Sequence, residues 1–258
     1  MPEPIPLSLV LQWPLPLPLM LVAVFALRIG SERAGSRYHL AAWTLVGVAF
    51  TTFTLCLGTQ TVFGAVAWFA GKHSAEWADY LRWRPALEHS RTFLMVGTSA
   101  ALAALAMARA EPGRRFAVAA ALLMAAGMAA GAVGGTIEGT LKTLLHLTTV
   151  AVLDVVELLV LMGMLFALLV SNRADRYLWA LLAVYAASVA LGIAWLVVVA
   201  PIDTPGAWHP PLWTFSVMRL ILYGTMAAIA FRRWRVGRRG RPMRGMLGPE
   251  RMQISALR

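Results

Sequence analysis

Long apolar blocks separated by short polar connections dominate the pattern along this chain. Seven apolar runs can be marked, and most contain the roughly 20 apolar residues that a helix needs to cross a bilayer. The pattern predicts an all-α fold, a polytopic integral membrane bundle with seven transmembrane helices. The runs cover residues 7–28, 40–70, 92–110, 116–135, 144–170, 177–200 and 212–231.

The first run departs from this regular pattern. Pro14, Pro16 and Pro18 remove three backbone donors within about one and a half turns, which disrupts a regular helix. The remaining stretch, 19–28, is too short to span the membrane alone. Either neighbouring helices satisfy a broken helix, or the run enters the membrane and returns, leaving six spans and a cytoplasmic N-terminus. We favour seven spans.

The composition agrees with a chain that is embedded in lipid almost throughout. Of its 258 residues, 59% are hydrophobic and 14% are charged, whereas about 25% of the residues in soluble domains are charged. We expect a single transmembrane domain over residues 1–235, followed by a basic cytoplasmic tail over residues 236–258. The single cysteine, Cys56, excludes an internal disulfide framework and a metal site built from several cysteines of this chain.

Basic residues are distributed unevenly between alternate connections. Seventeen of the 23 Lys and Arg residues lie in the connections and tail that follow the first, third, fifth and seventh runs. The positive-inside rule places this richer side in the cytoplasm, which predicts an outer N-terminus and a cytoplasmic C-terminus. The basic residues of the opposite side are Lys72, Arg82, Arg84, Arg91 and Lys142.

The basic tail suggests which partners the chain has. Nine basic residues lie in the last 28 positions, and such a cluster beside a membrane helix binds anionic lipid headgroups. We therefore expect a membrane anchor and no nucleic-acid partner. Together with the apolar runs, this predicts a multi-pass protein of the bacterial inner (plasma) membrane. Its expected partners are the lipid bilayer, anionic lipids at the tail, and either copies of itself or subunits of a larger membrane complex.

The fifth and seventh runs contain ionisable residues that lipid does not accommodate. His146, Asp154 and Glu157 fit one face of a helix at about 100° per residue. Each such group costs roughly 2.5–3.5 kcal/mol at the centre of a membrane helix, so it usually faces a protein interior or a hydrated cavity. Arg219 lies at a similar depth in the last run. We expect it to pair with Asp154 or Glu157, leaving the other carboxylate as a candidate proton carrier.

A polar stripe on the second run extends this site. Thr52, Cys56, Thr59 and Gln60 fall on one helical face. Threonine hydroxyls can bond to the backbone of their own helix, but the amide of Gln60 needs a partner elsewhere. Gln60 and Arg219 both lie in the outer half, so we expect a polar cavity that opens outward. The expected solute-binding or ion-binding residues are Asp154, Glu157, Arg219, His146, Gln60 and Thr59.

The outer histidines point to a second class of site. Imidazole suits zinc, copper and iron, and His89 and His146 both lie where apolar runs begin on the outer side. They could hold a haem or a metal, although no HxxxH or Cys–His spacing accompanies them. The cofactor is therefore left unknown. The candidate metal ligands are His89, His146, His73 and His209.

Two further segments have alternative interpretations. Gly127, Gly131 and Gly135 have a spacing that lets another backbone approach closely. Packing within the monomer is the leading interpretation, and a flat cofactor or a homodimer seam are the alternatives. The polar segment 71–91 is expected to form a helical hairpin or an interfacial helix.

Two function classes follow. The first is a small-solute or proton-linked carrier, or a membrane subunit of a larger complex, in which one carboxylate exchanges protons while Arg219 orients charge. The second is a membrane-embedded redox or metal-dependent enzyme, so whether the protein is an enzyme is left open. A retinal protein is excluded because Lys72 and Lys142, the lysines of this chain, lie at the outer boundary. A seven-helix zinc hydrolase is also excluded, because proteins of that class carry an HxxxH motif in their final helix and the last run here has no histidine.

Overall fold

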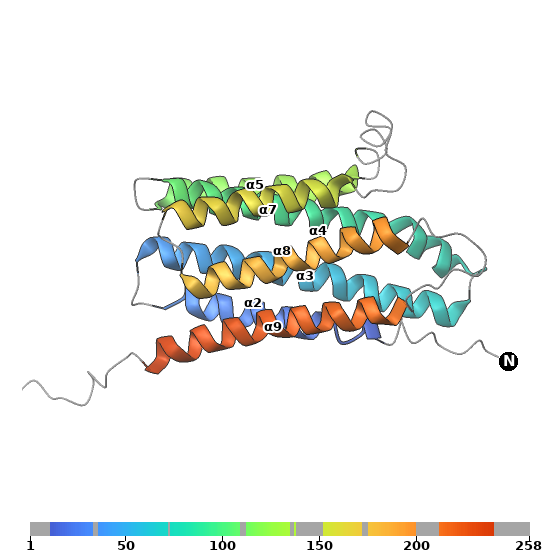
Figure 1. Ribbon diagram of the computed structural model, residues 1–258. Helices are drawn as coiled ribbons and strands as arrows, with labels where there is room; N and C mark the ends of the chain where they lie inside the picture. Colours follow the sequence, from blue (N-terminus) through green and yellow to red (C-terminus); the bar gives the residue numbers. More distant parts are fainter. Residues whose placement is uncertain are drawn as a thin grey trace, which may run out of the picture.

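Seven α-helices make up the part of the chain that the computed structural model describes, and no strand occurs there (Figure 1). Six of them are long and apolar enough to cross a membrane, which confirms the predicted helical membrane bundle. The helices are α2 (Pro16–Gly30), α3 (Arg37–Ala70), α4 (Ala75–Met107), α5 (Arg114–Ala132), α7 (Val152–Ser171), α8 (Arg176–Val199) and α9 (Leu212–Arg239). The described residues are 11–32, 36–71, 73–108, 112–134, 137, 152–171, 175–199 and 212–239.

Six of these helices form a closed ring. Around the ring, α2 packs on α3, α3 on α4, α4 on α7, α7 on α8, α8 on α9, and α9 returns to α2. The remaining helix, α5, packs against α4 (Figure 1). The ring therefore encloses a shared interior to which segments far apart in the sequence contribute.

The short member of the ring is α2. Its 15 residues extend about 22 Å, less than the roughly 30 Å of a hydrocarbon core. Pro16 stands in its first turn, where a missing N–H is tolerated. Gln12 lines a cavity at one end of the bundle, and Glu32 lies against Gly237 near the other end. The segment thus runs along the bundle, as a seventh span requires, and seven spans stay a prediction.

Two helices are longer than a bilayer requires. α3 and α4 have 34 and 33 residues, about 50 Å each, and Figure 1 shows their connected ends projecting beyond the other helices. Gly71 ends α3 with φ 95°, a left-handed conformation that glycine adopts without strain. The separate hairpin or interfacial helix expected over 71–91 is not formed. A single helix instead starts at Ala75 and passes through Pro85 to Met107.

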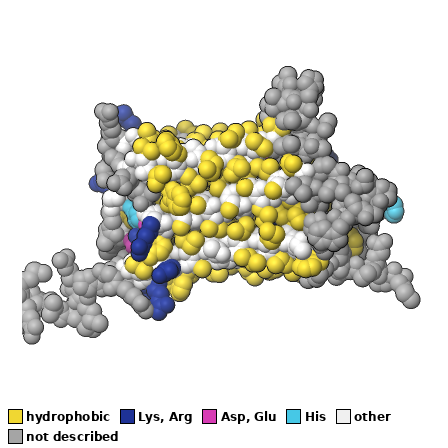
Figure 2. Space-filling model, in the orientation of Figure 1, with side chains coloured by type: hydrophobic (Ala, Val, Ile, Leu, Met, Phe, Trp, Pro, Cys, Tyr) yellow, Lys and Arg dark blue, Asp and Glu magenta, His cyan; other side chains and the backbone are white. Residues whose placement is uncertain are grey.

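Basic side chains gather at one end of the bundle. The helices alternate in direction, so the ends of α2, α4, α7 and α9 lie beside the starts of α3, α5 and α8 (Figure 1). Figure 2 shows Lys and Arg at this end, which we call the basic end, and a largely hydrophobic face along the bundle. The orientation of this end in a membrane stays a prediction, and the tail beyond Arg239 lies outside the described residues.

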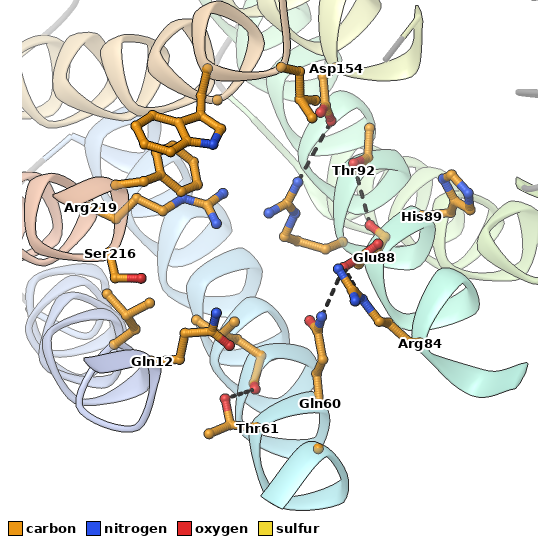
Figure 3. A pocket seen from close by; sticks show the side chains of 18 of the residues that line it. Gln12, Gln60, Thr61, Arg84, Glu88, His89, Thr92, Asp154, Ser216 and Arg219 are labelled. Carbon is orange, nitrogen blue, oxygen red and sulfur yellow. Dashed lines mark hydrogen bonds and ion pairs between the residues drawn. The ribbon is translucent and has the colours of Figure 1, made fainter. Parts of the chain in front are cut away.

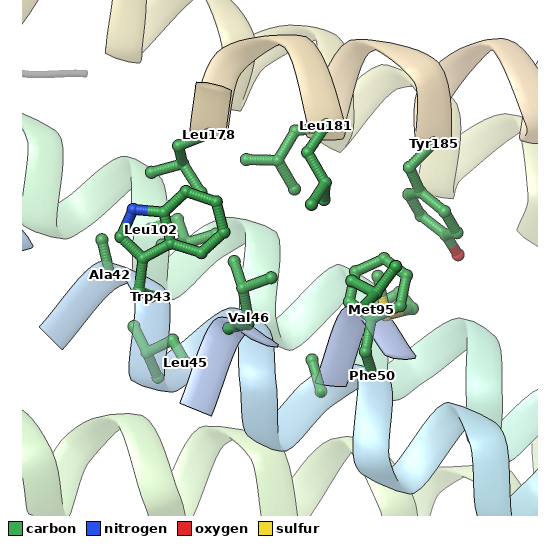
Figure 4. Close-up of a cluster of buried hydrophobic side chains, with 14 of the residues drawn as sticks. Ala42, Trp43, Leu45, Val46, Phe50, Met95, Leu102, Leu178, Leu181 and Tyr185 are labelled. Carbon is green, nitrogen blue, oxygen red and sulfur yellow. The ribbon is translucent and has the colours of Figure 1, made fainter. Parts of the chain in front are cut away.

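An apolar core fills the half of the ring toward the basic end. Trp43 and Phe50 of α3 are fully buried, and Figure 4 shows them facing Leu178, Leu181 and Tyr185 of α8. These large side chains occupy the space between α3 and α8. The space between α3 and α8 is therefore filled in this half, and the cavity described below lies nearer the opposite end.

Four aromatic side chains form a layer across the interior. The ring centroid of Tyr185 lies 5.8 Å from that of Phe50 and 6.1 Å from that of Phe53. Phe53 in turn lies 6.0 Å from Tyr223 of α9. The near-perpendicular rings have the edge-to-face geometry that aromatic pairs prefer. We call Phe50, Phe53, Tyr185 and Tyr223 the aromatic layer.

Glycines attach α5 to α4. A Cβ atom at Gly127 would lie 2.6 Å from the carbonyl oxygen of Phe93, and one at Gly131 would overlap Ser90. Glycine is thus required at both positions for the two backbones to approach this closely. This confirms packing within the monomer as the role of Gly127 and Gly131, while Gly135 lies outside the described residues.

Candidate functional site

A cavity of about 650 Å³ lies inside the ring, at the end opposite the basic end. Its size falls within the range of about 300–1,000 Å³ that is typical of small-molecule sites. The six ring helices, or the residues directly preceding them, contribute to its wall. Figure 3 shows Ser216 and Arg219 on one side of the cavity and Asp154, Thr92 and Glu88 on the other. Its charged and amide side chains are Gln12, Gln60, Arg84, Glu88, Arg91, Asp154 and Arg219.

Aromatic side chains line the cavity as well. Trp77 of α4 contacts Trp68 and Tyr80, with ring centroids 6.5 Å and 5.7 Å apart. On the other side, Trp195 of α8 stacks on Phe215 of α9 at 5.1 Å. Trp and Tyr favour the membrane interface, and aromatic side chains are also typical of the walls of small-molecule pockets. The wall thus combines flat apolar surfaces with a few charged groups.

Arg91 of α4 is the cation that faces the carboxylates of α7. Its Nη2 atom lies 3.7 Å from Oδ1 of Asp154, and its guanidinium lies 5.4 Å from the ring centroid of Phe53. Glu157, one turn deeper than Asp154, also interacts electrostatically with Arg91. One arginine therefore serves two carboxylates at the floor of the cavity.

Glu157 is fully enclosed by protein. Its exposed fraction is 0%, and the hydroxyl of Tyr185 on α8 donates a hydrogen bond to Oε1. The second oxygen, Oε2, has no hydrogen-bond partner among the described residues. Buried carboxylates are usually fully hydrogen-bonded, so this group is held in a costly environment.

Arg219 does not form the ion pair that the sequence predicts. No carboxylate of the described residues is recorded within 4 Å of it, and its guanidinium instead lies 4.9 Å from the ring centroid of Phe215. Arg91 takes the predicted place because α4 is one continuous helix, which carries the last residue of segment 71–91 to the level of Asp154. The sequence feature that could have indicated Arg91 is its position directly before the apolar run 92–110.

The amide of Gln60 finds the partner that its position requires. Nε2 donates a hydrogen bond of 2.9 Å to Oε1 of Glu88, and Nε of Arg84 donates one of 3.0 Å to the same oxygen. Figure 3 shows all three side chains in the cavity wall. This network links α3 to α4, and Glu88 and Arg84 were not among the site residues predicted from the sequence.

The threonines of α3 mostly bond to their own helix. Thr52 and Thr61 donate to the carbonyl oxygens of Val48 and Leu57, at 3.2 Å and 2.8 Å. Thr59 is exposed and does not line the cavity, contrary to the sequence prediction, whereas Thr61 does line it. The physical reason is the rotation of α3 about its axis. Leu57, Thr61 and Gly64 lie on the face that lines the cavity, whereas Thr59 points away from that face.

The histidines do not form a metal centre within the described residues. No group of three or more His, Cys, Asp or Glu side chains there could hold a metal ion. His89 lines the cavity and His73 is exposed. His146 and His209 lie outside the described residues, so a haem or metal bound through them stays a hypothesis.

A second charged cluster lies at the basic end. Asp175, before α8, accepts a hydrogen bond from Arg233 of α9. Nε2 of His39 on α3 lies 2.7 Å from Nη2 of Arg233 and 3.6 Å from Oδ2 of Asp175. We call these three residues the inner cluster. Along α3, the aromatic layer lies between this cluster and the cavity.

The geometry thus describes one cavity that has charged residues at its floor and is closed on one side by packed aromatic rings. This arrangement can bind a polar solute and can hold a proton on a carboxylate. Comparison with known proteins adds no relative: no family model, curated protein or solved structure matches this chain.

Proposed function

We propose that this protein is a carrier that binds a small polar solute in the cavity and couples its movement to protons. The observation that carries this proposal is the placement of Arg91, Asp154 and Arg219 around about 650 Å³ of space inside an apolar ring. Ionisable residues inside membrane helices are costly, and they commonly mark substrate and proton pathways. A purely structural ion pair needs no adjoining cavity.

The closed end supports a carrier with two alternating states. The aromatic layer stands between the cavity and the inner cluster, which lies at the basic end. A carrier exposes its site to one side of the membrane at a time, by moving one group of helices against another. α3 and α9 contribute both to the cavity wall and to the inner cluster, and Asp175 of the cluster directly precedes α8, which also lines the cavity. A shift among these three helices would therefore open one end while it closes the other.

Glu157 is the proposed proton carrier. Arg91, Asp154 and Arg219 act on its charge, and Tyr185 holds one of its oxygens. The two positive charges of Arg91 and Arg219 are balanced by the two negative charges of Asp154 and Glu157 when both acids are ionised. A proton on Glu157 leaves one positive charge in excess, so the charge of a bound solute and the protonation of Glu157 become linked.

The proposed location is the inner membrane of a bacterial-type cell, with the basic end in the cytoplasm. The excess of basic residues in alternate connections supports this orientation. The cavity then opens to the outside, and the carrier takes up its solute from there.

Reconstituted proteoliposomes loaded with a pH-sensitive dye test the proposal. A panel of succinate, glutamate, phosphate and glucose is added outside, and the internal pH is recorded. We expect at least one solute to change the internal pH beyond that of protein-free liposomes. Glu157→Gln should remove the change, while Thr59→Ala, on the exposed face of α3, should retain it. The proposal fails if no solute produces a change, or if Glu157→Gln and Asp154→Asn both behave as the wild type does.

A further inference from the structure

We propose that the solute is a small anion, and that Arg219 binds its carboxylate or phosphate group at the floor of the cavity. This inference rests on the proposed function, because it names the chemical class of the solute at the same site. It follows from the pairing of charges, the geometry of Arg219 and the shape of the floor.

Arg219 is the arginine of the cavity wall that has no close carboxylate partner among the described residues. Arg84 donates to Glu88 at 3.0 Å. Arg91 lies 3.7 Å from Asp154 and also faces the second carboxylate of α7. Among the described residues, no carboxylate is recorded within 4 Å of Arg219. Glu157 acts on Arg219 without forming a close ion pair. When Glu157 carries a proton, this counter-charge is lost, and a bound anion would replace it, because a guanidinium inside a membrane protein is costly without a counter-charge.

The geometry of Arg219 suits a planar acceptor. Its guanidinium lies over Phe215 at 4.9 Å, and Phe215 in turn stacks on Trp195. Stacking occupies the face of the guanidinium but leaves the N–H groups at its edge free, the arrangement that binds carboxylate and phosphate oxygens in pairs. Its buried Nε has no partner among the described residues. Figure 3 shows the guanidinium extending from α9 toward the middle of the cavity.

A small recess below the main cavity completes the site. It has a volume of about 20 Å³, enough for one water-sized group. Arg91 and Arg219 both line it, together with the buried side chains of Ser188 and Tyr223. Two guanidinium groups and two hydroxyls can thus surround one oxygen-bearing group. The rest of the solute would occupy the larger cavity above.

A positively charged solute fits this floor less well. Asp154 also lines the recess, but Arg91 already opposes its charge. A cation there would lie beside two guanidinium groups, and like charges at such distances repel strongly in a site of low polarity. With a proton on Glu157, the floor carries one positive charge in excess, so in that state it selects against cations as well as for anions.

The test is the thermal stability of the full chain in dodecyl maltoside, titrated with matched pairs of anionic and neutral compounds. The pairs are benzoate and benzamide, succinate and succinamide, and glycerol 1-phosphate and glycerol. We expect at least one anion to raise the melting temperature more than its neutral partner does. Arg219→Gln should weaken its apparent binding about tenfold or more, since the loss of one charge-assisted pair of hydrogen bonds is of that order.

Two further variants keep the test decisive. Arg219→Lys retains the charge but loses the planar fork, so it should weaken binding severalfold even if Arg219→Gln does not fold. Arg238→Gln is the matched control, because Arg238 stacks on Trp234 of the same helix at 4.6 Å but lies at the basic end. Arg238→Gln should bind the anion as tightly as the wild type does.

The same assay separates a free anion from a lipid headgroup. Stabilisation by glycerol 1-phosphate in detergent supports a free solute, whereas stabilisation by phosphatidylglycerol but not by glycerol 1-phosphate assigns the site to a lipid phosphate. Both results support an anion at Arg219. The inference is overturned if no soluble anion exceeds its neutral partner and phosphatidylglycerol gives no stabilisation, or if both Arg219 variants bind as tightly as the wild type. Glucose-driven pH changes in proteoliposomes without anion binding would overturn the inference and leave the carrier function standing.

Discussion

The hydroxyl of Tyr185 on α8 donates a hydrogen bond to the carboxylate of Glu157 on α7, at the level where the cavity gives way to the aromatic layer. Both side chains are buried. The bond joins neighbouring ring helices, and Tyr185 itself lines the recess that Arg91 and Arg219 also line. A change in the packing of α8 on α7 would therefore alter this hydrogen bond and with it the surroundings of the proposed proton carrier, Glu157.

Tyr185→Phe tests the stabilising role of this bond. Removing the hydroxyl leaves a buried carboxylate with one partner fewer, which should lower the free energy of unfolding by about 1–3 kcal/mol. Thermal unfolding in detergent measures the loss. Tyr177→Phe on the same helix is the control, because among the described residues the hydroxyl of Tyr177 meets only the exposed Arg176, at 3.2 Å. Equal losses in the two variants would contradict the assigned role of Tyr185.

Arg91 and Glu157 should be energetically coupled. Arg91 interacts electrostatically with Glu157. Removing one partner of a buried ion pair costs about 3–5 kcal/mol because the other charge is left uncompensated, whereas removing both is much less harmful, and we expect the same trend for these two charges. We therefore expect Arg91→Leu combined with Glu157→Leu to cost less than the sum of the two single variants. The same cycle with Arg219→Leu should show weaker coupling. Additive losses for Arg91 and Glu157 would contradict the pairing.

The sequence was sufficient to identify the carboxylates of the site but not their arginine. The cost of placing Asp154 and Glu157 in lipid is a property of their own apolar run, so a single sequence reveals it. The choice between Arg91 and Arg219 depends on which helices are neighbours around the ring, and α4 lies beside α7. Hydrophobic periodicity carries no information on that order.

Long-range contacts explain the other misses. The inner cluster joins three runs of the sequence through His39, Asp175 and Arg233, each of which reads alone as an ordinary residue beside a helix end. Thr59 and Thr61 differ by a rotation of about 200° on α3, and only the packed ring decides which of them faces inward. The bundle itself was predictable because long apolar runs and alternating basic connections are local features.

Gly131→Ala should displace α5 from α4. The added Cβ would overlap Ser90, and such overpacking costs about 1–3 kcal/mol. Gly163→Ala is the control, because a Cβ at that position on α7 meets no atom within 4 Å. That variant should be unchanged or stabilised by up to about 1 kcal/mol through its higher helix propensity. Thermal unfolding of both variants checks the prediction, and a destabilised Gly163→Ala with an unchanged Gly131→Ala would refute it.

Asp175→Asn should weaken the basic end of the ring. The substitution removes the charge that Arg233 and His39 face, and hydrogen bonds to charged groups contribute about 1.5–3 kcal/mol. We expect a lower melting temperature for this variant. Arg176→Gln, at the exposed neighbouring position, should change it little. If both variants melt as the wild type does, the inner cluster does not hold α3, α8 and α9 together.

The position of Gly192 allows the cavity itself to be tested without knowledge of the solute. Gly192 of α8 lines the cavity, and a Cβ there would meet no atom within 4 Å. A cysteine at this position therefore fits and faces the hydrated space. Ala186 on the same helix is buried toward the basic end, so a cysteine there is the matched control. Cys56→Ser removes the natural thiol from both variants.

The most direct measurement of the central claim is the labelling of these cysteines in intact cells by a membrane-impermeant methanethiosulfonate reagent. The account predicts that Gly192→Cys reacts from outside the cell while Ala186→Cys stays unlabelled. Reaction of Gly192→Cys only after the membrane has been permeabilised, or no reaction at all, would contradict a hydrated cavity that opens away from the basic end.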